Sequence, residues 1–220
     1  MEVLGHGVYS LPDAAKLTRL KQQRVREWFT GSRGTRARQS VFQSDYSSLA
    51  GDRAISFHDL IELFIAGQLR DNGVSLQTLR KVYKRLQADL GTRHPFCRRE
   101  IMTKDGQVFL LGLDPRGTEE MIEVLTRQRV FPDILMPFLR RMDYDEATEM
   151  AKRWCIADLV VIDPAICFGK PMIEGVGINT AVLAACYEAN DHDAELVADW
   201  FKVHSKHVIA AVDFERNFAA

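Results

Sequence analysis

The sequence has no long apolar run, and this absence argues against a protein that crosses a membrane by helices. No stretch of its 220 residues without Lys, Arg, Asp or Glu reaches the roughly 18 residues that such a helix needs. The first residues, Met1–His6, lack the basic and apolar regions of a signal peptide. The four cysteines are far apart and form no C-x-x-C pair, which argues against a disulfide framework or a zinc site. We therefore expect a soluble cytoplasmic protein with no membrane contact.

The chain as a whole has no excess of positive or negative charge, but its two halves differ. The chain has 29 Lys and Arg against 30 Asp and Glu, which gives a formal net charge of −1. Residues 1–100 carry 17 basic and 10 acidic residues, a net of +7, whereas residues 101–220 carry 12 and 20, a net of −8. This asymmetry is typical of a chain in which one half binds a polyanion and the other has a different role. Chance segregation of solvated charges is the alternative.

The basic surplus lies in one short window, residues 16–38, which contains eight Lys and Arg and a single acid. Ser10 can cap a short helix that has Pro12 in its first turn. A second helix is expected over about residues 22–29, because three apolar side chains fall on one side of it at i, i+3 and i+4: Val25, Trp28 and Phe29. Gly31 ends this helix, and an arginine-rich polar loop follows. The order predicts a winged helix-turn-helix.

Two interpretations of the basic window remain open. In the first, the second helix enters the major groove of double-stranded DNA, where Gln and Arg side chains bind base edges, and the loop arginines contact phosphates. In the second, the window is only a basic, solvated face on a small helical domain. We favour DNA binding, because the basic run coincides with the helices, turn and loop. The candidate DNA-binding residues are Lys16, Arg19, Lys21, Gln22, Gln23, Arg24, Arg26, Arg33, Arg36 and Arg38.

The same stretch resembles the opening of the MerR-type regulators, which bind DNA through a winged helix-turn-helix. The resemblance rests on Tyr9-Ser10-Leu11, Ala15, Leu17, Leu20 and Val25-Arg26-Glu27-Trp28, and further on Phe57–Leu63 and Leu69–Leu76. It covers about residues 8–90. Arg19 stands where that family has a turn glycine, and Lys21 where it has a serine that caps the recognition helix.

The rest of the basic half indicates a further helical pair. An apolar helix follows Ser56 and ends at Asn72-Gly73, and Ser75 can cap a helix whose apolar residues recur at helical spacing up to Leu86. Asp105-Gly106 is flanked by extended segments and predicts a β-hairpin. We expect this first domain to end near residue 117.

The acidic half predicts two helices, a short strand and three more helices. The first two cover residues 118–130 and 145–154, and Leu159–Ile162 is the expected strand. Turns at Asp163-Pro164 and Gly169-Lys170-Pro171 follow. The last three helices are expected at Thr180–Ala189, Ala194–Phe201 and Lys206–Phe218.

No pattern in the chain predicts catalysis. Gly169-Lys170 lacks the phosphate-loop frame, and Pro171 occupies the position of its hydroxyl residue. His204 and His207 are three residues apart, but no third ligand stands at a suitable spacing, so surface histidines are the simpler interpretation. No serine or cysteine lies in a motif that would activate it. We expect no enzyme, no cofactor and no metal ion.

The acidic half resembles the small domain of the VapB-type antitoxins, which was long described as a domain of unknown function. Ile162-Asp163-Pro164, Gly169-Lys170-Pro171, Ile173, Gly175 and Ile178 carry the resemblance, together with the three helices that follow. It covers about residues 160–215. In type II toxin–antitoxin systems such an antitoxin binds a toxin, and the resemblance implies a PIN-like ribonuclease as the partner.

The last 60 residues are acidic, with four Lys and Arg against nine Asp and Glu, a net of −5. A groove-reading helix with this balance would work against the phosphate field. We assign this part to dimerisation and protein contact, with a self-contained core as the alternative use of its apolar residues. The candidate partner and dimer residues are Val182, Leu183, Leu196, Trp200, Phe201, Val208, Val212 and Phe214.

We therefore predict a mainly α fold with small β-hairpins, in three parts. Residues 1–117 would form a MerR-like winged helix-turn-helix domain, 118–158 a helical linker, and 159–220 a three-helix, homeodomain-like dimerisation and partner domain. The function we favour is a homodimeric, antitoxin-like transcriptional repressor that binds operator DNA and neutralises a PIN-like ribonuclease toxin. A MerR-like regulator that responds to a small ligand and an interaction adaptor without a DNA role are the alternatives.

Overall fold

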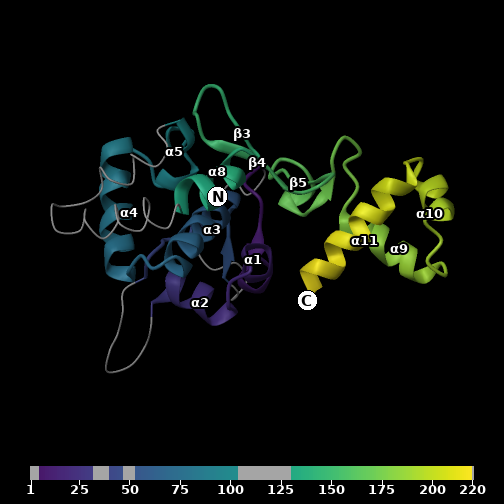
Figure 1. The fold of residues 1–220 in the computed structure, drawn as a ribbon, viewed down its shortest axis with the longest axis horizontal. Helices are drawn as coiled ribbons and strands as arrows, with labels where there is room; N and C mark the ends of the chain where they lie inside the picture. The colour runs from purple at the N-terminus through teal and green to yellow at the C-terminus, as the bar shows by residue number, and fades with distance from the viewer. Residues whose placement is uncertain (1–4, 32–39, 47–52, 104–129, 220) are drawn as a thin grey trace. The chain divides into compact units, whose positions relative to one another are not determined.

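A computed structural model describes residues 5–31, 40–46, 53–103 and 130–219 of the chain. The chain divides into two compact units (Figure 1), of which the larger is Tyr9–Ala151 and the smaller is Lys152–Ala220 together with Met1–Val8. The described residues are mainly helical, with small antiparallel sheets, as the sequence predicts. None of the helices in these ranges is both long and apolar enough to span a bilayer.

The larger unit begins with two short helices. Strand β1 (Tyr9–Ser10) leads into α1 (Leu11–Thr18), where the Ser10 hydroxyl accepts the Asp13 N–H and caps the helix as predicted. Helix α2 (Gln22–Thr30) follows after three residues. Strand β1 pairs antiparallel with β2 (Ala54–Ile55), which places the start of α1 beside the segment that leads into the next helix.

Helices α3 (Phe57–Asp71) and α4 (Leu76–Leu90) form the centre of this unit. Ser56 and Asp59 make a capping box at the start of α3, and the Ser75 hydroxyl accepts the Thr78 N–H at the start of α4. The Ser75 cap and the break between the helices at Asn72-Gly73 agree with the sequence prediction, whereas the capping box at Ser56 was not predicted. Helix α3 packs against α1 and α4, so its buried apolar residues join the two helical pairs: Leu60, Ile61, Leu63, Ile65 and Leu69.

Short elements complete the larger unit. They are the 3₁₀-helix η1 (Pro95–Cys97), α5 (Glu100–Thr103), the π-helix η2 (Val130–Leu135), α8 (Met136–Leu139) and β3 (Met142–Tyr144). The rings of Phe64 and Phe138 stack at 3.9 Å between centroids, which fixes α8 on α3. The predicted hairpin at Asp105-Gly106 lies outside the described residues. So do residues 118–129 of the helix that was predicted over 118–130.

The expected helix over residues 145–154 is wrong, and with it the helical character of this part of the predicted linker. The Asp145 carboxylate accepts the N–H groups of Ala147 and Thr148, which stabilises a turn instead of a helix. Strand β4 (Ala151–Ala157) begins soon after. A side-chain cap and a buried Trp154 within an extended segment thus override the helical pattern.

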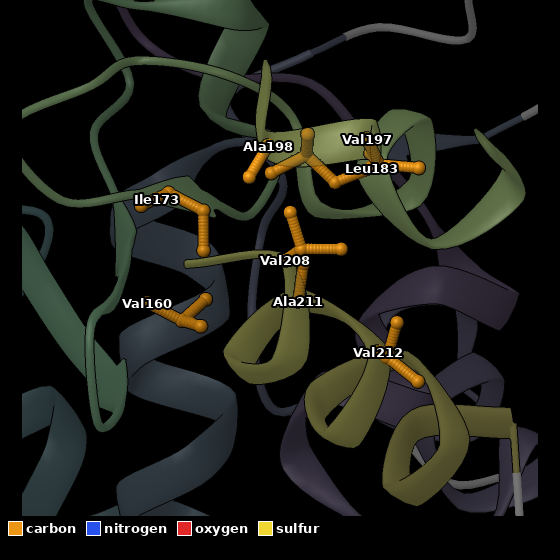
Figure 2. Packing of buried hydrophobic residues seen from close by; sticks show 8 residues of the cluster. All are labelled: Val160, Ile173, Leu183, Val197, Ala198, Val208, Ala211 and Val212. Carbon is orange, nitrogen blue, oxygen red and sulfur yellow. The ribbon is translucent and has the colours of Figure 1, made fainter. Parts of the chain in front are cut away.

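The smaller unit consists of a short sheet and three helices. β5 (Val160–Ile162) pairs antiparallel with β4 and with β6 (Met172–Ile173), and η3 (Cys167–Gly169) lies between β5 and β6. Helices α9 (Thr180–Ala189) and α10 (Ala194–Phe201) have the predicted bounds, and α11 (Ser205–Ala219) extends one residue beyond its prediction at each end. Figure 2 shows the core that the sheet and helices share: Val160, Ile173, Leu183, Val197, Ala198, Val208, Ala211 and Val212.

Candidate nucleic-acid interface

The inner face of α2 is held by aromatic packing. Val25, Trp28 and Phe29 are buried, as the helical spacing predicts. The ring of Phe42 lies 6.0 Å from that of Trp28 and 5.6 Å from that of Phe29, and it also contacts Tyr83 of α4 at 5.1 Å. This packing fixes the orientation of α2 against the rest of the larger unit.

The turn between α1 and α2 is tight and closely packed. Arg19 adopts a left-handed backbone with φ of 56°, the conformation that a glycine would supply most cheaply at this position. Leu20 is buried against α3 at Gly67, where an added Cβ would lie 2.9 Å from the Leu20 side chain. Gly67 therefore allows the close approach that seats the turn on α3. Lys21 is the N-cap residue of α2, and its side chain makes no capping hydrogen bond.

The outer face of α2 is polar and exposed, and only some of its side chains form hydrogen bonds or ion pairs with other described residues. Gln22, Gln23 and Arg26 are exposed. The Gln23 amide donates a hydrogen bond to Glu27 at 2.9 Å. Among the described residues, Arg26 has no ion-pair partner, whereas Arg24 lies toward the flank of the helix and pairs with Asp71 of α3 at 2.6 Å. Arg26 is therefore the arginine of α2 whose guanidinium is available to a ligand.

The remaining predicted basic residues lie on either side of α2 in the chain. Lys16 and Arg19 are exposed at the end of α1, and Lys21 is exposed at the start of α2, so the structure brings these three together around one turn. Arg33, Arg36 and Arg38 lie outside the described residues.

Both ends of the predicted wing segment are anchored at the C-terminal end of α2. The Gly31 N–H donates to the Glu27 carbonyl, and the N–H groups of Val41 and Phe42 both donate to the Trp28 carbonyl at 2.8 and 3.0 Å. The chain therefore leaves α2 and returns to it at the same place.

A buried polar cluster lies elsewhere in the larger unit, and sequence reasoning missed it. Asp45 pairs with the His94 ring at 3.0 Å and accepts the Ser56 hydroxyl at 2.6 Å. One oxygen of Asp59 accepts the N–H groups of Asp45 and Ser56, both at 3.1 Å. Glu62, which is 1% exposed, accepts the Phe96 N–H at 3.0 Å. These bonds tie the segment around Asp45 and the turn before η1 to α3.

The carboxylates of this cluster differ in their protonation behaviour. Burial would raise the pKa of Asp45, but hydrogen bonds from His94 and Ser56 and the nearby positive charges hold it well below its usual range. Burial raises the pKa of Asp59, and it raises that of Glu62 well above the usual range although Phe96 and Tyr83 oppose the shift. One feature of the sequence could have indicated this cluster. Glu62 stands within the apolar run of α3, where a purely hydrophobic core would have an apolar residue.

Within the described ranges, Asp45, Asp59 and His94 are the residues that could hold a metal ion, because one ligand atom of each lies within 4.8 Å of the others. Asp45 and Asp59 already accept hydrogen bonds from the protein's own donors. A cation would have to replace several of these bonds. The arrangement fits a structural network that fixes a loop on α3 better than a metal centre.

The predicted partner residues of the smaller unit fall into two groups. Leu183, Val208 and Val212 are buried in its core (Figure 2), and Phe201 and Phe214 pack against that core. They serve the self-contained core that was the alternative use of these residues. The side chains left for a partner are exposed by 46%, 39% and 57%: Val182, Leu196 and Trp200.

Comparison with known proteins finds a family match within the smaller unit and a similar fold for most of the chain. Residues 160–214 match the family described as "Protein of unknown function (DUF433)". The crystal structure of Rv2018 from Mycobacterium tuberculosis is similar to this chain with a TM-score of 0.73, and the match covers 93% of this chain and 96% of that one. The two are 18% identical, so the likeness concerns the fold. No curated protein matches the chain.

Proposed function

We propose that this chain is an antitoxin-like repressor, whose larger unit binds operator DNA and whose smaller unit binds a PIN-like ribonuclease toxin. The observation that carries the proposal is the outer face of α2. It presents exposed Gln22, Gln23 and Arg26 on a helix whose opposite face is locked by aromatic packing. Such a rigid helix can place its polar side chains against base edges in the major groove.

The charge around α2 supports this role. Lys16, Arg19 and Lys21 surround the turn that leads into the helix. At the other end of the helix, Gly31 and Val41 stand in the chain on either side of the arginine-rich segment 32–39, which lies outside the described residues. Cations beside the start of a groove-reading helix suit contacts with phosphates, which supply affinity and register without reading sequence. The resemblance to the MerR-type regulators, through Tyr9-Ser10-Leu11 and Val25–Trp28, points in the same direction.

The proposed toxin partner rests on the smaller unit. Its resemblance to the VapB-type antitoxins, through Ile162-Asp163-Pro164 and Gly169-Lys170-Pro171, falls within the residues that match the family of unknown function. Its acidic balance suits a protein partner better than DNA. In the proposed assembly, a homodimer would place two copies of α2 about one DNA turn apart on a palindrome.

A gel-shift titration with the DNA upstream of the chain's own gene tests the DNA role. We expect a retarded complex whose affinity falls steeply as the salt concentration rises, and a weaker complex for a scrambled duplex of the same length. Unchanged mobility of the upstream DNA at 50 mM salt would contradict the proposal. A complex that forms only with an added small molecule would favour the ligand-responsive regulator instead.

The toxin role is tested by co-expression with the ribonuclease-like product of a neighbouring gene. We expect the ribonuclease alone to arrest growth, and the chain to restore growth and co-purify with it. Arrest that the chain does not relieve would remove the antitoxin part of the proposal and leave the DNA part standing.

A further inference from the structure

Helix α10 buries one side and exposes two different stripes on the other. Val197 and Ala198 lie in the core, and α10 packs through this side against α9 and α11. Leu196 and Trp200 point outward, one helical turn apart. Among the described residues of the smaller unit, Trp200 is the most exposed large apolar residue after Phe168, at 57%. An exposed Trp beside an exposed Leu on a rigid helix is the kind of anchor that protein interfaces use.

An acidic stripe runs beside this apolar pair. Glu195 and Asp199 are also one turn apart and exposed, and neither has an ion-pair partner among the described residues. Asp191 and Asp193, just before the helix, are exposed as well. Between residues 191 and 201 the chain has four acids and no Lys or Arg. The outward surface of α10 is therefore apolar in one stripe and negative in the next.

This charge pattern decides which partner fits. In a symmetric contact between two copies, the outer surface of α10 in one copy would face the same surface in the other. The carboxylates of Glu195 and Asp199 from both copies would then lie around the contact. Like charges facing one another oppose such a contact. The surface instead fits a protein that offers a cavity for Trp200 with Lys or Arg beside it. A ribonuclease binds RNA phosphates through a cationic groove, so its surface has the required sign.

We propose that the outer face of α10, made of Glu195, Leu196, Asp199 and Trp200, is the docking surface for the ribonuclease toxin. This inference rests on the proposed function and assigns its protein partner to one helix. Trp200 is the apolar anchor, and Glu195 and Asp199 contact the cationic rim. Occupation of that rim by carboxylates would compete with RNA phosphates for the same cations.

Two variants of the full-length chain test the surface, each with a control substitution on α11. Trp200→Ala removes the anchor, and Ile209→Ala removes an apolar side chain that is 41% exposed. The double variant Glu195→Lys/Asp199→Lys reverses the acidic stripe, and Asp213→Lys reverses an exposed acid on the other helix. Because all these side chains are exposed, the thermal unfolding midpoints should stay close to that of the parent chain. Calorimetry with the purified ribonuclease of the neighbouring gene gives the affinities.

We expect Trp200→Ala to weaken binding about 30-fold or more, as truncation of a central Trp commonly does. The double reversal should weaken it about tenfold or more at 50 mM salt and less at 300 mM. The α11 controls should stay within about twofold, and all variants should retain the DNA affinity of the parent chain.

Each other outcome has a separate meaning. If the parent chain binds the ribonuclease and all variants bind equally well, the docking surface is overturned and the proposed function stands. Selective loss in the α11 controls overturns it in the same way. If Trp200→Ala changes the oligomeric state but not ribonuclease binding, the occupant is a second copy and the inference is wrong. If the parent chain itself does not bind the ribonuclease, the toxin partner and this surface both fall.

Discussion

Two short helices, α2 and α10, bury their apolar sides in the same way but present opposite surfaces. The outer face of α2 holds Gln22, Gln23 and Arg26, whereas that of α10 holds exposed Trp200 and Leu196 beside carboxylates. A polyanion binds cations and amides and gains little from exposed apolar area, whereas a protein partner can bury an aromatic side chain in a pocket. The formal charge of −1 is the sum of a basic half with a net of +7, which contains α2, and an acidic half with a net of −8, which contains α10.

Neighbouring residues in α9 test which apolar side chains of the smaller unit belong to the core. Leu183→Ala should lower the free energy of unfolding by about 3 kcal/mol, because it leaves a cavity in the core of Figure 2. Val182→Ala, at a side chain that is 46% exposed, should change it by less than about 0.5 kcal/mol. Urea denaturation measures both. Equal effects would show that the division into core and surface residues is wrong.

Neighbouring arginines in α2 test the proposed DNA face. Arg26→Ala should weaken binding to the upstream DNA by about 1–3 kcal/mol, the usual contribution of an arginine that contacts a base. Arg24→Ala should weaken it less, because the Arg24 guanidinium is engaged with Asp71 at 2.6 Å. Fluorescence anisotropy with labelled DNA measures the affinities, and Arg216→Ala in the smaller unit controls for the loss of one positive charge. If Arg24→Ala weakens binding more than Arg26→Ala, the DNA contact lies on the flank of α2 that holds Arg24 and not on its outer face.

The buried acids of the larger unit predict an unusual pH dependence. The folded-state pKa of Glu62 is raised by burial, so the folded protein keeps this proton when the unfolded chain has lost it, and stability falls as the pH rises above about 4.3. Glu62→Gln removes the titrating group, so the variant should lose less stability between pH 5 and pH 8 than the parent chain, while its amide oxygen can still accept the Phe96 N–H. Thermal unfolding at pH 5 and pH 8 tests it, with exposed Glu146→Gln as the control. A variant that loses as much stability between pH 5 and pH 8 as the parent chain would refute this account of Glu62.

Two left-handed residues join helices in the two units and give the smallest expected effect. Arg19 and Lys202 have φ of 56° and 55°. Replacing either with glycine should stabilise the chain by about 1 kcal/mol, because glycine adopts this backbone without strain. Only Arg19→Gly should also weaken DNA binding and reduce its salt slope, by about one unit. Equal DNA affinities for the two variants would exclude Arg19 from the DNA contact.

The sequence predicted local elements well where one physical signal dominated. The caps at Ser10 and Ser75, and the bounds of α9 and α10, follow from side-chain caps and apolar spacing, and the structure confirms them. Residues 145–154 were mispredicted because helical spacing carried no information on the turn that Asp145 makes with its own backbone.

The sequence predicted which residues form the candidate site, but not which of them pair with residues elsewhere in the chain. The spacing of α2 identified its polar face, yet the ion pair between Arg24 and Asp71 joins residues 47 positions apart, which no local pattern reveals. The same limit applies to the cluster of Asp45, Asp59 and His94, whose members come from three segments. In the smaller unit, apolar spacing could not tell buried Leu183 from exposed Trp200.

The salt dependence of binding to the upstream DNA tests the central claim most directly. If the face of α2 and the cations around it bind phosphates and bases, the association constant should fall about 1000-fold or more between 50 and 200 mM salt for a dimer with six or more phosphate contacts. Arg26→Ala should bind more weakly at every salt concentration. An association constant that does not change with salt, or no binding at 50 mM, would contradict the account.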